Sequence, residues 1–558
     1  MDALHAVARR VYGMAGALHP LASERDQNAR LDTTTGRFVL KLINAGEDAA
    51  LIGLQDATLR HLGQVAGIPR LVPTLGGADH GAEGACLVRL VTWADGVTLS
   101  AAPRSLTQLR NLGAFMGRVT RGLQGFGHPA AIRADFPWSL DHVSALKADV
   151  AGDARRALLQ GLFDRYEARV LPVQLGLRAQ VLHQDANDNN VIVNPDDPDQ
   201  ITGLIDFGDM CYGRTVNELA ITLAYALLDA PDLYAAARAL IAGYVAEFPL
   251  LEGEADQLYD LMRMRLVCSL CISSRQSRLH PDNAYLLISQ APAFALLERL
   301  DRIDPEFMVA LFRRAAGFAA TKAVAPLRAY LVQAQVAQVF QPPLASAARI
   351  ALLTNGEQPG MPAFSDRGFD AWFAAQRPTA RPASVAFYGL GAYAEQRSVY
   401  ATDQFSDAAS TERRTRHTGI DVFCAAGTAV HAPLAGGVPF YTLYGHLGAS
   451  LPGLCKVGQT VEAGDLIAHL GDWHENGGWA AHLHFQIMSD ILAQTNGNFF
   501  GAGHASLWDV WSDICPDPNL IMRLAEESFT VDPQPPAALM PRRARAIGPS
   551  LSLSYTQP

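Results

Sequence analysis

The stretch VLHQDANDNNVIV, residues 181–193, decides the fold of the first half of the chain, together with LIDFGD, residues 204–209. The longer stretch carries the spacing HxDxxxxN at His183, Asp185 and Asn190. Apolar runs flank its polar centre, which indicates a loop between two strands. In the shorter stretch Asp206 begins a DFG motif, 16 residues after Asn190. Aspartate and asparagine are common in turns, but that preference does not explain this order and spacing.

These residue types suit phosphoryl transfer. Asp185 can accept the proton of a substrate hydroxyl, while Asn190 and Asp206 can hold Mg²⁺ on nucleotide phosphates. A lysine on an upstream strand is also needed, and Lys41 in FVLKL is the only lysine in the first 146 residues. The sequence therefore predicts a kinase-like site in which Lys41 reaches the phosphates. A solvated lysine at a strand edge is the alternative interpretation.

Three further segments have expected places around this site. SERDQN, residues 23–28, precedes the lysine strand and is expected to form the loop over the phosphates, although it lacks GxGxxG. LVTWADG, residues 90–96, is expected to be the hinge between two lobes. Gln55 and Asp56 lie near the place of the usual acidic partner of the lysine, but neither is a glutamate.

Residues 1 to about 340 resemble the aminoglycoside phosphotransferase superfamily, and within it the hydroxylysine kinases and related small-molecule kinases. The resemblance is carried by VLHQDANDNNVIV, LIDFGDMCYGRTVNELA and GHPAAIRADFPWSLDH. It implies a bilobal protein-kinase-like fold that phosphorylates a hydroxyl of a small, often cationic molecule, with ATP or GTP and Mg²⁺. Asp185 would be the catalytic base, Asn190 and Asp206 the magnesium ligands, Lys41 the phosphate contact and His183 a brace for the loop.

A second group of polar residues lies near the end of the chain. Seven of the 16 histidines fall within residues 417–484. His417 and Asp421 form HxxxD, and His482 and His484 form HxH. Residues i and i+2, like i and i+4, point to one face of a strand, so both motifs can aim into one cleft. Two histidines and a carboxylate around an open position describe a catalytic zinc site.

These motifs resemble the lysostaphin-type zinc metallopeptidases. The resemblance implies that His417, Asp421 and His484 bind Zn²⁺, while His446 and His482 act on the water and the developing oxyanion. In that family, strands separate the first small-residue turn from the YxH segment, whereas here APLAGGV runs directly into PFYTLYGHL. A missing strand pair would leave part of the metal cleft without a wall. Zinc binding is therefore a firmer expectation than peptidase activity.

The expected fold class is multidomain α+β: the bilobal kinase-like fold, followed by a mostly β peptidase domain. The expected parts are an N-lobe with hinge, a helical C-lobe, a proline-dotted linker, the zinc-site domain and a connecting tail: 1–96, 97–345, 346–384, 385–495 and 496–558. The ending SLSLSYTQP and the segment SDICPDPNLIM resemble the lead-in to a class III aminotransferase module. This resemblance implies that the chain is a fragment of a three-module protein.

Composition limits the remaining classes. The net charge of −10 argues against a nucleic-acid partner. The longest apolar run, Leu219 to Leu228, is about half the length of a membrane-spanning helix. The first residues do not have the pattern of a signal peptide, and seven scattered cysteines do not suggest a disulfide framework, so a cytoplasmic protein is expected. Cys268 and Cys271 form a lone CxxC in a helical run, which favours core packing over a metal or redox role.

The favoured function is phosphorylation of an amino alcohol or hydroxylated amino acid, beside a zinc-site domain. Three alternatives stay open. The chain could be an antibiotic-modifying kinase, a zinc hydrolase whose kinase half senses nucleotide, or a scaffold for a downstream phospho-lyase.

Overall fold

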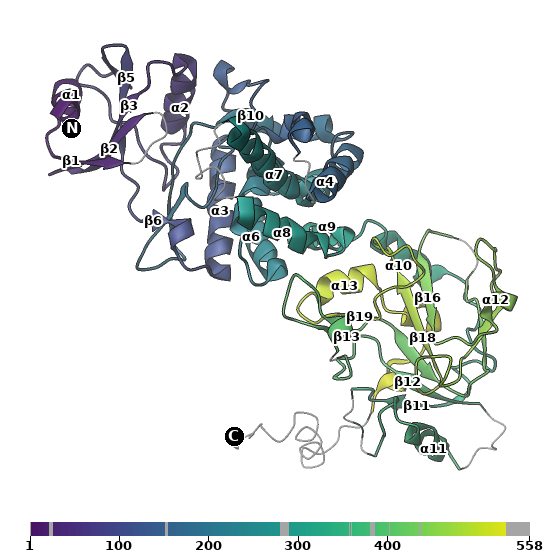
Figure 1. The fold of residues 1–558 in the computed structure, drawn as a ribbon. Helices are drawn as coiled ribbons and strands as arrows, with labels where there is room; N and C mark the ends of the chain where they lie inside the picture. The colour runs from purple at the N-terminus through teal and green to yellow at the C-terminus, as the bar shows by residue number, and fades with distance from the viewer. Residues whose placement is uncertain are drawn as a thin grey trace, which may run out of the picture. The chain divides into compact units, whose positions relative to one another are not determined.

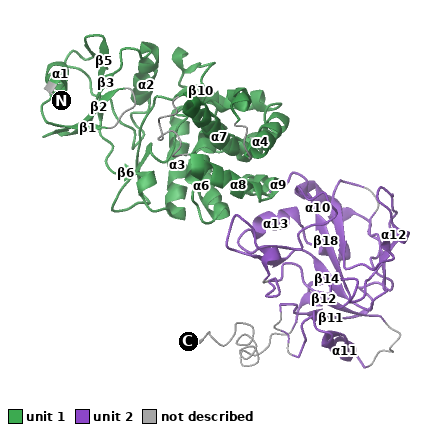
Figure 2. Cartoon of the chain, in the orientation of Figure 1, with its two compact units in different colours: residues 1–318 green, residues 319–558 purple. Residues whose placement is uncertain are grey.

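The computed structural model describes residues 2–21, 26–150, 155–279, 290–355, 358, 360–379, 386–400, 402–434 and 437–531. The chain forms two compact units, Met1–Phe318 and Ala319–Pro558 (Figure 2). The finer boundaries expected from the sequence stay predictions. In the part of the chain described, no helix combines the length and the apolar character needed to cross a membrane.

Unit 1 begins with a five-stranded antiparallel sheet in the order β1-β2-β3-β5-β4 (Figure 1). Its strands are β1 (Ala17–Leu21), β2 (Gln27–Thr33), β3 (Gly36–Ile43), β4 (Gly81–Glu83) and β5 (Cys86–Thr92). Side chains alternate between the two faces of a strand, so Leu40 and Leu90 lie on one face and Lys41 and Arg89 on the other. The apolar face packs on helix α1 (Asp2–Tyr12). The polar face is therefore left for a site.

The rest of unit 1 is mainly helical. Its helices are α2 (Ala49–His61), α3 (Leu106–Gly122), α4 (Arg156–Arg169), α5 (Val216–Ala226), α6 (Leu233–Glu247), α7 (Glu252–Leu279), α8 (Gln290–Asp301) and α9 (Pro305–Ala315). Helices α3 and α6 approach closely through Gly113, where a Cβ atom would clash with the Leu240 carbonyl oxygen. Cys268 and Cys271 are buried on α7, which confirms the expected core packing.

Two small sheets hold the predicted catalytic segments. Strand β6 (Val97–Thr98) pairs with β8 (Val191–Val193), and β8 pairs with β9 (Ile201–Leu204). The other sheet joins β7 (Ala179–Leu182) to β10 (Cys211–Arg214). The loop between two strands that was predicted for residues 181–193 is thus confirmed.

Unit 2 is built on a five-stranded sheet in the order β11-β12-β14-β18-β16. Its strands are β11 (Ala348–Leu352), β12 (Phe387–Gly391), β14 (Ile420–Phe423), β16 (Tyr441–Gly445) and β18 (His482–Met488). Two strand pairs accompany it, β13 (Arg414–His417) with β19 (Ala502–His504) and β15 (Ala429–His431) with β17 (Leu466–His469). The helices are α10 (Val324–Gln333), α11 (Gly368–Ala375), α12 (Leu451–Leu454), α13 (Trp508–Ile514) and α14 (Asn519–Met522).

The segment expected as a linker, 346–384, contains two regular elements. Strand β11 forms the edge of the main sheet and runs parallel to β12. Helix α11 packs Phe373 on Phe387, with ring centroids 4.9 Å apart. The apolar run RIALL forms the edge strand. The prolines that suggested a linker lie outside this run. The expected aminotransferase lead-in at 550–558 lies outside the described residues.

Candidate functional site

The predicted catalytic residues of unit 1 lie in two loops that the small sheets hold together. Asp185 follows β7, Asn190 directly precedes β8, and Asp206 follows β9. The backbone adopts the left-handed region at Gln184 (φ 71°) and Asp206 (φ 61°). Such conformations are costly for residues other than glycine, and they commonly occur at functional sites.

Both carboxylate oxygens of Asp185 accept hydrogen bonds. The side-chain amides of Asn187 and Asn190 donate to Oδ2 at 2.9 and 2.7 Å. The guanidinium of Arg265 on α7 donates to Oδ1 at 3.0 Å. Because Asn190 donates through its amide nitrogen, its amide oxygen remains suited to bind a cation.

The pKa of Asp185 is raised to about 7. Burial is the main cause, the charge of Arg265 opposes the rise, and Asp209 and Asp206 add to it. A carboxylate with a pKa near neutrality can take up and release a proton under ordinary conditions, as a general base must. The geometry and the charge of this loop therefore suit proton transfer.

His183 lies behind the loop rather than in it. The ring Nε2 donates to the carbonyl oxygen of Ile205 at 3.1 Å, and Nδ1 accepts from the backbone N–H of Asp185 at 3.3 Å. Burial lowers its pKa to about 4, so the ring is neutral. The backbone N–H groups of His183 and Gln184 donate to the buried carboxylate of Glu218 on α5 at 2.7 and 3.3 Å. These contacts suit the expected bracing role.

A cavity of about 460 Å³ lies between the polar face of the first sheet and the catalytic loops. It is lined by Lys41, Asn190 and Asp206, and by Thr92, Trp93, Ala94 and Gly96 of the segment expected as the hinge. Burial and the neighbouring Arg89 lower the pKa of Lys41. Among the described residues no carboxylate lies within ion-pair distance of Lys41. The partly buried Lys41 and the predicted metal-binding pair thus line the same cavity.

Gln55 and Asp56, which lie near the expected place of an acidic partner for Lys41, contact Arg89 instead. Gln55 and Asp56 of α2 accept hydrogen bonds from Arg89 at 2.7 and 3.0 Å, not from Lys41. Arg89 is the register partner of Lys41 on the adjacent strand. Half of the expected phosphate loop, residues 23–25, lies outside the described residues.

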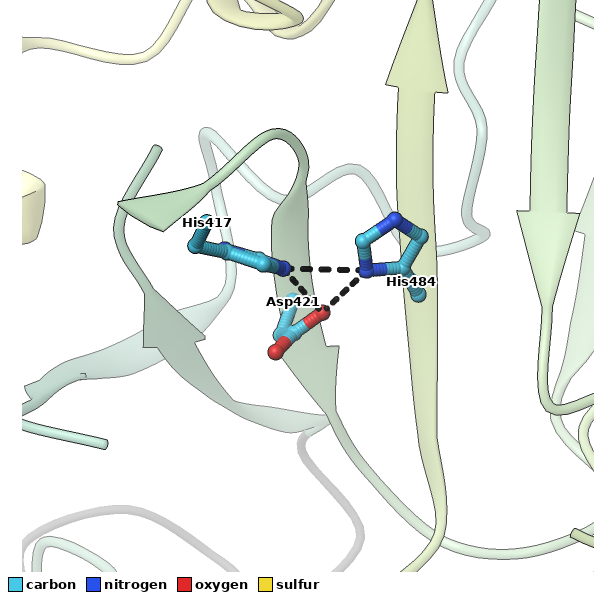
Figure 3. Close-up of side chains that lie close together, drawn as sticks. All are labelled: His417, Asp421 and His484. Atoms are coloured by element: carbon cyan, nitrogen blue, oxygen red, sulfur yellow. Dashed lines mark hydrogen bonds and ion pairs between the residues drawn. The ribbon is translucent and has the colours of Figure 1, made fainter. Parts of the chain in front are cut away.

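In unit 2 the sheet brings the predicted metal ligands together. Asp421 on β14 and His484 on β18 are directly paired in register, and His417 ends β13. His417 Nε2 lies 3.0 Å from His484 Nδ1 and 3.3 Å from Asp421 Oδ1, and the latter two atoms are 3.1 Å apart (Figure 3). Tetrahedral zinc ligands at about 2.0–2.1 Å from the metal lie about 3.3–3.4 Å apart. The three atoms therefore have nearly the spacing of zinc ligands.

The outward-facing ring nitrogens fix the tautomers of the two histidines. His417 Nδ1 donates to the carbonyl oxygen of Ala392 at 3.1 Å, and His484 Nε2 donates to Oε1 of Gln486 at 3.0 Å. In the neutral rings, the facing nitrogens consequently carry lone pairs. Two lone pairs and a carboxylate oxygen repel one another unless a cation or a proton lies among them. The donor set thus fits a divalent metal ion, with second partners of the kind that orient metal-binding histidines.

The other oxygen of Asp421 is occupied by Arg397. This arginine is only 1% exposed and donates to Oδ2 at 2.7 Å and to the hydroxyl of Tyr400 at 3.0 Å. Asp421 therefore has one oxygen to offer to a metal ion. Although burial acts in the opposite direction, His417 and Arg397 hold the pKa of Asp421 well below its usual range.

The two histidines predicted to act on water lie against each other. The rings of His446 and His482 have centroids 4.1 Å apart. His446 follows Gly445, which pairs in register with His484, so both rings lie near the ligand cluster. Burial lowers the pKa of His482 to about 3. Strand β16, which leads to His446, is the last strand of its sheet, at the place where the sequence lacks the expected strand pair.

Motif reasoning missed four residues that contact the predicted site residues: Arg265, Glu218, Arg397 and Gln486. A charged residue within the apolar helical run MRLVCSLC was a signal for Arg265, because buried arginines are rare unless paired. The strand period of two was a signal for Gln486, which shares the face of His484. Arg397 had no comparable signal in its surroundings.

Comparisons with known proteins concern the first half of the chain. The phosphotransferase enzyme family matches residues 17–253. Hydroxylysine kinase of Danio rerio is 32% identical over 317 residues, which cover 53% of this chain and 89% of the relative. The Mus musculus hydroxylysine kinase is 26% identical over 329 residues, 53% of this chain and 87% of the relative.

Solved kinase structures also align with this half. An amicoumacin kinase in complex with AMP-PNP and Ca²⁺ has a TM-score of 0.43 and 16% identity, over 53% of this chain and 92% of that one. A microcompartment-associated aminopropanol kinase has a TM-score of 0.43 and 17% identity, over 57% and 99%. The sequence matches identify the first half as a kinase-like α+β domain, and through it the chain belongs to the phosphotransferase enzyme family.

Proposed function

We propose that unit 1 is a nucleotide-dependent phosphotransferase that phosphorylates a hydroxyl of a small amino alcohol or hydroxylated amino acid. The observation that carries the proposal is that Lys41, Asn190 and Asp206 line one cavity, while Asn190 is hydrogen-bonded to Asp185. Family membership and the names of the relatives support the same reaction. ATP and GTP both remain open as phosphate donors.

Each residue has a defined task in this proposal. Lys41 binds the nucleotide phosphates, and Asn190 and Asp206 would hold Mg²⁺ through their side-chain oxygens. Bound there, the metal ion would neutralise charge on the phosphates. Asp185 accepts the proton of the acceptor hydroxyl as that oxygen attacks the terminal phosphorus. The amides of Asn187 and Asn190 keep the carboxylate in place.

The acceptor is identified by a substrate panel. Purified protein with Mg²⁺ and either nucleotide is incubated with ethanolamine, choline, hydroxylysine, threonine, homoserine and aminoglycosides, and products are recognised by the mass of an added phosphate. The proposal predicts a phosphorylated amino alcohol or amino acid. A product only with aminoglycosides would favour the antibiotic-modifying alternative, and no product with any acceptor would contradict the proposal.

A second function is proposed for unit 2, which we infer to bind Zn²⁺ through His417, Asp421 and His484. The facing lone pairs of the two histidines support it. Zinc would make a bound water more acidic, and the peptidase resemblance gives His446 and His482 the proton transfers of a hydrolysis. Metal analysis of protein purified without added metal tests the binding, and a peptide substrate screen tests hydrolysis.

The scaffold and hydrolase alternatives predict different effects of single substitutions. If unit 2 is a scaffold, His482→Ala leaves both turnover and metal content unchanged. If the chain is a hydrolase with a nucleotide-sensing half, Asp185→Asn spares hydrolysis. The aminotransferase-like partner module and the cytoplasmic location stay predictions.

A further inference from the structure

Arg265 is a buried cation that no sequence motif of the proposed reaction includes. It lies in the middle of α7, 80 positions after Asp185, and is only 1% exposed. Its Nη2 donates to Asp185 Oδ1 at 3.0 Å. Since Asn187 and Asn190 occupy Oδ2, Arg265 is the group that fixes the remaining oxygen of the proposed base.

The guanidinium is itself held on several sides. It donates to the carbonyl oxygen of Trp138 at 3.3 Å and to the hydroxyl of Tyr225 at 3.2 Å. Its central carbon lies 4.7 Å from the ring centroid of Trp138 and 5.4 Å from that of Tyr225. A planar cation between aromatic rings has few alternative rotamers, so its fork has a defined direction. The Trp138 carbonyl also accepts from the Gln184 side chain at 3.2 Å, which ties this clamp to the catalytic loop.

The charges around Asp185 are mostly negative. Asp206 and Asp209 face it from the loop after β9, and Glu218 lies on α5. Arg265 is the cation that faces Asp185 from α7. A hydrogen bond from a cation to a carboxylate is stronger than one from a neutral donor, so Arg265 fixes the direction of Oδ1.

We propose that Arg265 is a positioning residue for phosphoryl transfer, which orients the Asp185 carboxylate toward the acceptor hydroxyl. The inference rests on the proposed kinase function. One lone pair of Oδ1 faces Arg265, and the other is left for the acceptor hydroxyl. The hydroxyl proton passes to Asp185 while the oxygen–phosphorus bond forms and the bond to the leaving nucleotide breaks.

The test compares Arg265→Met and Arg265→Lys with Arg263→Met. Arg263 is the matched control, because it is a buried arginine of the same helix that bonds Asp260 instead of Asp185. With the acceptor found in the panel, Arg265→Met is expected to lower kcat by about 100-fold with an unchanged KM for the nucleotide.

Arg265→Lys keeps the charge but loses the planar fork. It is expected to lower kcat less than Arg265→Met does, and it provides a second variant if Arg265→Met does not fold. Guanidinium ion added to Arg265→Ala is expected to restore part of kcat, and to restore none in Asp185→Asn. Arg263→Met is expected to keep the wild-type kcat.

If the wild type turns over and both Arg265 variants keep its kcat, the inference is overturned and the proposed function stands. A loss of thermal stability in the Arg265 variants without a change in kcat would also overturn the inference and leave the proposed function standing. Absence of turnover by the wild type with every acceptor would instead reject the proposed function, and the role of Arg265 with it.

Discussion

Asp185 is partly buried and Asp421 is buried, and each is hydrogen-bonded to one arginine that is 1% exposed. Their pKa values nevertheless move in opposite directions, to about 7 for Asp185 and well below the usual range for Asp421. Asp185 is surrounded by other carboxylates, whereas Asp421 faces imidazole rings. The comparison teaches that the neighbours beyond the arginine decide what the carboxylate can do. One becomes suited to proton transfer and the other to metal binding.

The two sites also differ in whether the oxygen and nitrogen atoms of their key residues have hydrogen-bond donors from the protein. The oxygens of Asp185 accept bonds from protein donors, while the three ligand atoms of unit 2 face one another with lone pairs. We expect this contrast to appear most strongly in metal binding. His484→Ala should lower the zinc affinity by about 100-fold or more, since even outer partners of metal ligands contribute about 10- to 100-fold. Zinc content after dialysis against a chelator of known affinity measures the effect.

The control for that prediction is phosphoryl transfer. His484→Ala should keep the wild-type kcat for the acceptor found in the panel. Equal zinc content in wild type and His484→Ala would contradict the assignment of this cluster as a metal site.

The orientation of His484 gives a second, smaller effect. Gln486→Leu removes the acceptor for Nε2–H, so the ring is free to adopt the other tautomer. Zinc affinity should fall by about 10- to 100-fold, the range for outer partners of metal ligands. Competition with a chromogenic chelator measures it, and Gln494→Leu, in the segment between β18 and β19, provides the control. An affinity equal to that of the wild type would show that Gln486 does not orient His484.

Sequence reasoning succeeded where the chemistry is local. Asp185, Asn190 and Asp206 fall within 22 consecutive residues, and the strands that separate them were readable from apolar runs. His417 and Asp421, like His482 and His484, are also close neighbours in sequence. Which strands pair was not readable, because the register of Asp421 with His484 joins segments 63 positions apart.

The supporting residues could not be found in the same way. Arg265 and Arg397 reach their aspartates from separate elements, and no spacing rule links an arginine to a carboxylate across a fold. Composition was also a poor guide to residues 346–384, where a linker was expected. The prolines around RIALL favoured a linker, but this run forms an edge strand that depends on β12 for its hydrogen bonds.

A third prediction concerns the pH dependence of phosphoryl transfer, which should follow the protonation of Asp185 and not that of Asp421. A base must be ionised to accept a proton, and the raised pKa of Asp185 means that it becomes protonated as the pH falls through about 7. The value of kcat/KM for the acceptor should therefore fall about tenfold for each pH unit below about 7. A profile flat from pH 8 to pH 5 would exclude Asp185 as the base, with the acceptor's own ionisation measured separately.

The proposed role of Asp185 as the base of a kinase is tested most directly by the steady-state kcat for phosphate transfer to the best acceptor. This kcat is measured in the wild type, Asp185→Asn and His417→Ala. We expect Asp185→Asn to lose about 10²- to 10⁴-fold in kcat while still binding nucleotide, the range expected when a general base is removed. His417→Ala should match the wild type. Wild-type turnover by Asp185→Asn would contradict the account.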